Sequence, residues 1–338
     1  MTASTLVLPD GGVGIVATGM ALGEHVVTTE ELAARHGWDA AAVARIQKGA
    51  GVARRHHAAA KTTTADLAAR AAVGLTDPTP ARLLLATVSA DTPVPAGAPR
   101  VAARLGWTDR AASDVGAACS GFLYGLDLAA RHVLTGDPAV LLVAADVRSR
   151  FVPWDRPGTA SLFGDGAGAA LVAPTPAGTG LLACTLHADG RRADTVQIPA
   201  GGSREPTSPE SARAGRHLLH MDEGPQLFLE AVEGMVDAGV ACLALRNLTW
   251  EDVDIVVPHQ PNARVVERIH RFARIPADRV FNNVQNRGNM GGATLAVALH
   301  EAIEQGRVRP GARVLLLAAG AGFTAGAAYL VWPGASAA

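Results

Sequence analysis

Short apolar runs alternate along the chain with longer segments of helical periodicity. Four apolar runs have the length and the Leu or β-branched content of buried strands: 81–89, 139–147, 254–260 and 312–320. Three segments show the spacing of amphipathic helices: 121–136, 261–273 and 292–306. Strands that alternate with helices predict an α/β protein whose sheets are covered by helices on their faces.

The sequence also contains an internal repeat. In each half, a short strand leads through a Gly-rich turn into a helix, then a second strand and a Gly/Ala-rich strand. Cys119 and Asn289 each lie 17 residues before the glycine that ends the following helix. Such a repeat indicates a duplication into two similar halves, which we expect to be residues 1–175 and 176–338. The two helix starts should then lie near a pseudo-twofold axis, which brings distant residues together.

The composition is that of a folded globular protein. The 338 residues are 49% hydrophobic and 18% charged, and the formal net charge of −1 gives no sign of a nucleic-acid or anionic-membrane surface. No run approaches 18 apolar residues without Gly, Pro or charge, and the N-terminus lacks a secretion-signal pattern. Three scattered cysteines form neither a disulfide framework nor a CxxC metal site. We therefore expect a soluble cytoplasmic protein without nucleic-acid or membrane partners.

Three other features favour a structural interpretation. Residues 163–168 superficially resemble a dinucleotide loop, but no helix with a following acidic residue comes after them. His56 and His57 adjoin two arginines and are expected on a solvated face, where adjacent histidines make a poor metal site. The Pro-, Gly-, Ser- and Arg-rich segment 199–219 is expected to be a mobile loop at the mouth of a pocket.

The first candidate for chemistry is Cys119, in the small-residue run 114–126 where a strand gives way to a helix. One interpretation is inert packing, since buried cysteines fill space as small hydrophobes. The alternative is a nucleophile at a helix N-terminus, where the helix dipole lowers the thiol pKa and small neighbours let a substrate approach. The order of strand, Ala-Ala-Cys-Ser-Gly and helix resembles a nucleophile elbow.

Three further segments carry candidate polar groups. His259 ends an apolar strand, a place where α/β folds position reacting groups, although lone histidines there are often structural. Asn289 lies in the turn that the repeat pairs with Cys119, where Asn and Gly also build turns by themselves. The Gly-rich segment 318–326 either packs closely or directs a backbone N–H group at an oxyanion.

Six segments together resemble ketoacyl synthase III, a condensing enzyme of the thiolase superfamily: DVGAACSGF, FGDGAGAALV, HMDEGPQLFLEAV, VPHQPNARVV, RGN with its following helix, and AGFTAG. They occur in the family's order, from about residue 13 to the C-terminus. The resemblance implies a thiolase fold of two βαβαβαββ halves in five αβαβα layers, usually as a homodimer. It implies an acyl carrier protein as partner, acyl-CoA or acyl-carrier protein as donor, and neither metal nor cofactor.

The same resemblance assigns roles to the candidate residues. Cys119 would accept the acyl group, because a thiolate nucleophile splits one hard transfer into two easier steps. His259 and Asn289 would assist decarboxylation of a malonyl thioester and hold the enolate, which neutral donors stabilise at its oxygen. The N–H groups of Cys119 and Gly322 would form the oxyanion hole.

The sequence departs from the family where CoA and the acyl group bind. The family's adenine-stacking Trp falls at about Arg45 and its Arg at about Gly49, while Arg156 and Arg264 resemble other CoA-contacting arginines. Val94 falls where the family's partner subunit inserts a bulky residue into the acyl pocket. Because valine is smaller, this position indicates a larger or branched acyl group. GNMGGAT also replaces the family's GNTSAAS. These departures leave the donor open and predict a specialised enzyme of polyketide or other secondary metabolism.

Three functions follow as hypotheses. The leading one is decarboxylative condensation of an acyl primer with a malonyl-type extender. The alternative is an acyltransferase of the same fold that passes the acyl group from Cys119 to a hydroxyl, an amine or a carrier thiol, with His259 as general base. The third is an inactive subunit of a heterodimer, against which the complete Cys, His and Asn set argues.

Overall fold

The computed structural model describes residues 3–221 and 224–334. It confirms the expected alternation of strands and helices. The apolar runs form β5 (Arg82–Ala86), β7 (Val140–Val147), β12 (Ile255–Pro258) and β13 (Arg313–Gly320). The periodic segments form α5 (Gly121–Leu134), α9 (Ala263–Phe272) and α11 (Ala293–Glu304). None of the helices in these described ranges is long and apolar enough to cross a membrane.

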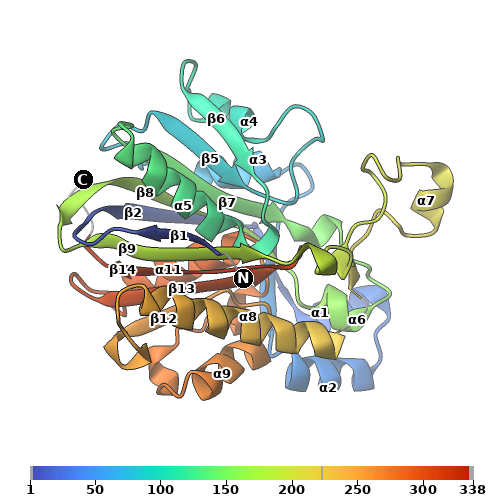
Figure 1. Cartoon of the computed structure of the whole chain (residues 1–338). Helices are drawn as coiled ribbons and strands as arrows, with labels where there is room; N and C mark the ends of the chain where they lie inside the picture. The colour runs from blue at the N-terminus through green and yellow to red at the C-terminus, as the bar shows by residue number, and fades with distance from the viewer. Residues whose placement is uncertain (1–2, 222–223, 335–338) are drawn as a thin grey trace.

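Two five-stranded sheets form the centre of the molecule (Figure 1). The first has the order β2-β8-β7-β5-β6, adding β2 (Gly11–Leu22), β8 (Asp165–Ala177) and β6 (Ala111–Val115). The second has the order β1-β9-β14-β13-β12, adding β1 (Ser4–Val7), β9 (Gly180–Ala188) and β14 (Thr324–Val331). β7 is parallel to β5 and antiparallel to β8, as β13 is to β12 and β14. The two sheets therefore repeat one arrangement.

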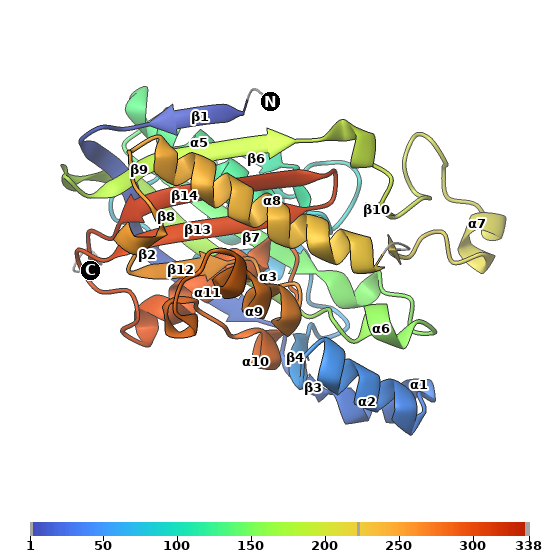
Figure 2. The ribbon, with the colours of Figure 1, turned by 60° about the horizontal axis from the view of Figure 1, so that its bottom comes forward.

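Helices separate and cover the two sheets (Figures 1 and 2). α5 and α11 lie between the sheets and contact both. The outer face of the first sheet is covered by α3 (Thr64–Ala71) and α4 (Ala98–Arg104), and that of the second by α8 (Gly224–Ala244) and α9. This is the αβαβα layer order implied by the resemblance.

The layers explain the apolar patterns. All eight residues of β7 are buried, because helices cover both faces of its sheet, and such strands consist of continuous apolar runs. In α11, nine of the 12 residues are buried, because this helix packs between two sheets rather than on one. The central layer thus places the first turns of α5 and α11 deep inside the molecule.

The remaining elements are short. They are α1 (Thr29–His36), α2 (Ala40–Gly49), α6 (Pro157–Ala160), α7 (Pro209–Arg213), α10 (Val284–Arg287), β3 (His25–Thr28), β4 (Arg54–His57), β10 (Val196–Gln197) and β11 (His220–Met221). Five single 3-10 turns complete the described chain: Ala118–Ser120, Arg148–Arg150, Gly190–Arg192, Trp250–Asp252 and Ala277–Arg279.

The halves of the chain interlock more than the repeat predicts. The expected boundary between residues 175 and 176 falls inside β8, which ends at Ala177. β1 pairs with β9 and so belongs to the second sheet. The segment 199–219 contains the helix α7 and projects from the body of the molecule between the paired strands β10 and β11 (Figure 1).

The prediction of a solvated face at His56 and His57 is wrong. This segment is β4, which pairs with β3, and both histidines are half-buried. The neighbouring Arg55 is fully buried and donates a hydrogen bond to the backbone oxygen of Ser161 at 2.5 Å. Burial lowers the pKa of Arg55 to about 10. Backbone and hydroxyl acceptors keep this buried cation hydrogen-bonded, which a sequence pattern of charged residues does not reveal.

Candidate active site

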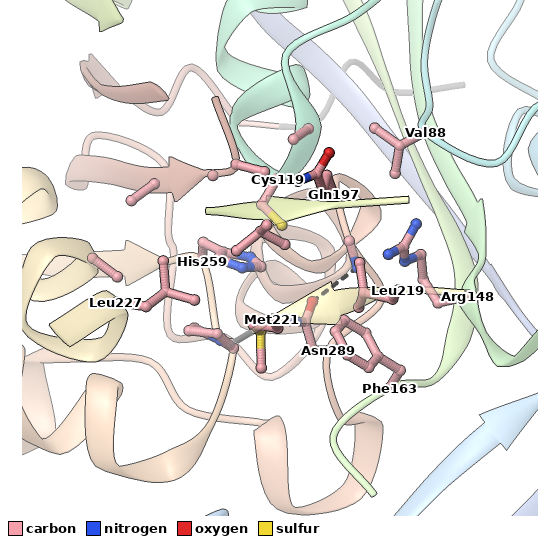
Figure 3. Close-up of a pocket in the computed structure, with 18 of the residues that line it drawn as sticks. Val88, Cys119, Arg148, Phe163, Gln197, Leu219, Met221, Leu227, His259 and Asn289 are labelled. Carbon is pink, nitrogen blue, oxygen red and sulfur yellow. Dashed lines mark hydrogen bonds between the residues drawn. The ribbon is translucent and has the colours of Figure 1, made fainter. Parts of the chain in front are cut away.

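A cavity of about 330 Å³ opens where parallel strands of both sheets end (Figure 3). Cys119, His259 and Asn289 line it together, as the repeat and the resemblance predicted. They come from the segments before α5, after β12 and before α11. Across residues 3–221 and 224–334, no group of three His, Cys, Asp or Glu side chains could hold a metal ion.

Cys119 is presented by a strained turn. β6 ends at Val115, and the 3-10 turn with Cys119 at its centre leads directly into α5. Ala118 has a φ of 45°, in the left-handed region that residues with a side chain seldom adopt. β14 holds the turn, because Thr324 Oγ1 donates to the backbone oxygen of Ala117 at 3.3 Å and Ser120 Oγ donates to that of Thr324 at 3.3 Å. The turn therefore fixes the thiol at the cavity wall.

The expected lowering of the Cys119 pKa is not met. The side chain keeps intermediate exposure because it faces the cavity, but protein surrounds it otherwise. Burial raises the pKa of the Cys119 thiol to about 11, while the positive charge of Arg148 acts in the opposite direction. The largest cause of this rise is the desolvation of a thiolate in a mainly apolar cavity. In the free protein, Cys119 is a thiol at neutral pH.

His259 is a neutral imidazole in this structure. It directly follows β12, is 2% exposed, and its backbone N–H donates to Leu317 of the neighbouring strand at 2.6 Å. Burial lowers the pKa of His259 to about 3. Nδ1 is buried and has no hydrogen-bond partner among the described residues. A neutral imidazole offers one N–H donor and one acceptor, and no positive charge, to a ligand in the cavity.

Asn289 is fixed by its backbone and by its own side chain. Its N–H donates to Leu162 at 2.8 Å, and its carbonyl oxygen accepts from the N–H of Gly164 at 3.0 Å. The side-chain Oδ1 accepts from the N–H of Gly291 at 2.9 Å, the bond drawn in Figure 3. Because Oδ1 is occupied in this way, the NH₂ group is the polar end that Asn289 offers to a ligand.

Asp146, which the sequence analysis did not single out, supports the Asn289 turn. Its carboxylate is fully buried and accepts from Ser89 Oγ and the N–H of Val88, both at 2.9 Å, and from the N–H of Gly292 at 2.9 Å. A Cβ at Gly291 would lie 2.3 Å from this carboxylate, and Gly291 has a φ of 59°. Gly291 of GNMGGAT is thus required by the approach of Asp146.

The turn between β13 and β14 forms the wall beside Cys119. Gly320 and Ala321 line the cavity, whereas Gly322 does not. A Cβ on Gly320 would lie 2.8 Å from the backbone nitrogen of Cys119, so only glycine allows this approach. Ala321 therefore lies at the cavity wall, whereas Gly322, the expected second oxyanion donor, lies outside this lining. The Gly- and Ala-rich sequence of this turn does not indicate which of its residues faces the cavity.

The predicted substrate-binding residues have different locations. A second cavity of about 690 Å³ adjoins the first at Met221, and Arg45, Gly49 and Arg264 line it. The Arg264 guanidinium lies 3.5 Å from the position of a Cβ on Gly49, so Arg264 lies beside the position of the family's missing arginine. Arg156 is exposed and outside this lining, although the two residues after it belong to it. Val94 is 83% exposed and lines neither cavity of its own chain.

Arg148 and Phe163 were also missed by the sequence analysis, and both line the catalytic cavity. Arg148 directly follows β7. A charged residue at the carboxyl end of a continuous apolar strand was the available signal, since such ends gather at one edge of a sheet.

Comparison with known proteins identifies the family. The model for 3-oxoacyl-[acyl-carrier-protein (ACP)] synthase III matches residues 113–190, and the model for its C-terminal part matches residues 243–332. The β-ketoacyl-[acyl-carrier-protein] synthase III of Roseiflexus castenholzii is 38% identical over 94% of this chain and 97% of that protein. The 3-oxopimeloyl-[acyl-carrier-protein] synthase of Rhodothermus marinus is 38% identical over 98% of this chain and 97% of that protein.

Solved structures agree in fold. The crystal structure of 3-oxoacyl-(acyl carrier protein) synthase III from Pseudomonas aeruginosa PAO1 matches with a TM-score of 0.86 and 32% identity, covering 95% of this chain and 98% of that chain. The thiolase fold expected from the resemblance is thereby confirmed. The family models, the identity over nearly the whole chain and the shared fold show that this protein belongs to the 3-oxoacyl-[acyl-carrier-protein] synthase III family.

Proposed function

We propose that this enzyme takes an acyl primer onto Cys119 and condenses it decarboxylatively with a malonyl-type extender on an acyl carrier protein. The observation that carries the proposal is the cavity in which Cys119 meets two neutral donors, His259 and Asn289. The burial that lowers the His259 pKa to about 3 keeps its imidazole neutral at pH 7. A neutral donor pair suits an enolate that forms and disappears within one reaction cycle.

The first step transfers the primer. The Cys119 sulfur attacks the thioester carbonyl, a new C–S bond forms, the bond to the carrier sulfur breaks, and the thiol proton passes to the leaving carrier thiolate. The carbonyl oxygen becomes an oxyanion during the attack, and we assign the N–H groups of Cys119 and Ala321 to it. The small residues on both sides of Cys119 leave room for the pantetheine thioester.

The second step forms the carbon–carbon bond. The malonyl thioester loses CO₂, and the electron pair of the broken C–C bond forms an enolate whose oxygen accepts from His259 and Asn289. The enolate carbon then attacks the acyl-Cys119 carbonyl, and the Cys119 thiolate leaves and takes up a proton. The product is a 3-oxoacyl thioester on the carrier. Binding of the extender beside the acyl group supplies the orientation that this attack needs.

The donor carrier and the assembly are part of the proposal. The second cavity, with Arg45, Arg264 and Arg268 in its wall, suits the phosphates of CoA or of a phosphopantetheine arm. The exposure of Val94 supports the homodimer, because an apolar side chain that is 83% exposed on the surface of one subunit is available to insert into the acyl pocket of a partner subunit. A role in polyketide or other secondary metabolism stays a prediction.

Mass spectrometry of the carrier after reaction with acyl thioesters and malonyl-carrier protein tests the proposal. We expect a 3-oxoacyl carrier with one CO₂ lost, and neither acyl-enzyme nor product with the Cys119→Ala variant. Acylated Cys119 with unchanged malonyl-carrier would contradict condensation and favour transfer to an alcohol, amine or thiol. No acyl-enzyme from any thioester, in a folded protein, would favour the inactive-subunit hypothesis.

A further inference from the structure

Arg148 places a positive charge inside the catalytic cavity. Its side chain is only 6% exposed and belongs to the cavity lining, across from Cys119 (Figure 3). The guanidinium carbon lies 5.4 Å from the centre of the Phe163 ring, which also lines the cavity. The ring and the burial hold the guanidinium in one place, so its position is part of the cavity's shape.

This guanidinium forms no direct ion pair with any residue that the structure describes. Within residues 3–221 and 224–334, no carboxylate lies within ion-pair distance of Arg148, and no acceptor forms a hydrogen bond with it. Its charge acts on the buried carboxylate of Asp146, whose oxygens already accept from Ser89, Val88 and Gly292. Among the residues that the structure describes, the rest of the cavity lining contains no acidic side chain. A cation in a mainly apolar cavity with no direct ion pair or hydrogen bond to the described residues is costly, so its presence here favours a ligand that supplies an anion.

We infer that the acyl primer carries a terminal carboxylate, which the Arg148 guanidinium binds within the same cavity as the Cys119 thioester. The inference rests on the proposed function, because it assumes that Cys119 accepts an acyl group. The planar guanidinium fork matches a carboxylate with two parallel N–H···O bonds, which gives selectivity as well as affinity. The substrate class is therefore the monothioester of a short dicarboxylic acid.

Two other roles for Arg148 make different predictions. If it bound the carboxylate of the malonyl extender, it would hold the group that must leave as CO₂ and would act only after acylation. If it only stabilised the Cys119 thiolate, since its charge lowers that pKa, it would speed acylation by every primer alike. A terminal carboxylate on the primer instead predicts an effect on acylation that depends on the primer.

The experiment compares isosteric primer pairs as N-acetylcysteamine thioesters, which need neither CoA nor a carrier. The pairs are succinyl with 4-methylpentanoyl, glutaryl with 5-methylhexanoyl, and adipyl with 6-methylheptanoyl. The acyl-enzyme is followed by intact-protein mass spectrometry without any extender. We expect at least one dicarboxylic member to acylate about 10- to 100-fold faster than its isostere, the range of one charge-assisted bidentate contact.

The variants Arg148→Leu and Arg148→Lys test the residue itself. Leu should abolish the preference for the carboxylate while retaining the alkyl primers, and Lys should retain part of it. The matched control is Arg110→Leu, since Arg110 also stacks on an aromatic ring, 4.2 Å from the centre of Trp107, but outside the cavity. If Arg148→Leu does not fold, binding of glutaryl and 5-methylhexanoyl thioesters to the Cys119→Ala protein measures the same preference.

The outcomes separate this inference from the proposed function. Equal acylation by both members of every pair, or an equal loss of both in Arg148→Leu, would overturn the inference. A carboxylate preference in acylation, followed by no 3-oxoacyl product with malonyl-carrier protein, would support the inference and contradict condensation. No acylation by any of the six thioesters would contradict the proposed function together with the inference that rests on it.

Discussion

The protonation of His259 makes stability depend on pH in a way that can be calculated. The imidazole pKa is about 3 in the folded protein, against 6.5 in the absence of burial. Below pH 6.5 the unfolded chain takes up a proton that the folded chain refuses, so stability present above 6.5 is lost as pH falls toward 3. Between pH 7.5 and pH 5.0 the free energy of unfolding falls by about 2 kcal/mol from this group alone. The loss builds up over the roughly 1.5 pH units below 6.5, at about 1.36 kcal/mol per pH unit.

Urea unfolding of the wild type and His259→Gln at both pH values measures this effect. The free energy of unfolding of the wild type should fall by about 2 kcal/mol more than that of the variant, which has no imidazole to protonate. The difference between the two proteins removes the contribution of other titrating groups. His25→Gln, a change at an exposed position, serves as the control and should follow the wild type.

The same assignment predicts the pH dependence of catalysis. A histidine that stays neutral to about pH 3 causes no loss of condensation rate near pH 6.5. Equal pH dependence of unfolding in wild type and His259→Gln would refute the buried neutral imidazole. So would an acid limb near pH 6.5 that disappears in the variant.

Three further predictions concern Cys119 and its neighbours. Gly320→Ala should slow acyl-enzyme formation about 10-fold or more, because the added Cβ would lie 2.8 Å from the Cys119 nitrogen. In the control Gly190→Ala the added Cβ meets nothing within 4 Å, so this variant should form the acyl-enzyme at the wild-type rate, as followed by intact-protein mass spectrometry. Iodoacetamide should label Cys119 ahead of the fully buried Cys184 and Cys242, as measured by peptide mass spectrometry. The rate of Cys119 labelling should rise about 10-fold per pH unit between pH 7 and 10, and a plateau below pH 8 would contradict the raised pKa of Cys119. Asn289→Ala should leave acylation largely intact and lower condensation by about 100-fold or more, and collapse of acylation in a folded variant would instead assign Asn289 to the turn or to primer binding.

The parts of the structure that follow from periodicity were predictable. The apolar runs gave β5, β7, β12 and β13, and the repeat related the turns of Cys119 and Asn289, which line one cavity. The hydrophobic periodicity of a buried strand or helix extends over all its residues, so one sequence is enough to predict the element. The location of a turn residue such as Ala321, as against Gly322, depends on backbone angles that the letters of a Gly-rich turn do not specify.

Buried charges were not predictable for a related reason. From the sequence, Arg55 is expected on the surface and Arg148 at the start of a loop, yet both side chains are more than nine-tenths buried. The burial of Arg55 depends on acceptors from distant segments, such as the Ser161 carbonyl, whereas Arg148 is buried with no hydrogen bond to any residue that the structure describes. Sequence neighbours of a charge do not contain that information.

Burial favours the neutral forms of Cys119 and His259, and in the proposed reaction this determines how acylation proceeds. It raises the pKa of Cys119 to about 11 and lowers that of His259 to about 3. A thiolate–imidazolium pair would have to overcome the desolvation of both ions in a mainly apolar cavity, so at pH 7 the free enzyme holds a thiol beside a neutral imidazole. In the proposed acylation, the thiol proton therefore leaves only as the sulfur attacks the thioester, when the charge of Arg148 favours the developing thiolate, and it ends on the departing carrier thiolate. His259 is then already neutral when the extender arrives, which is the form that donates to the enolate.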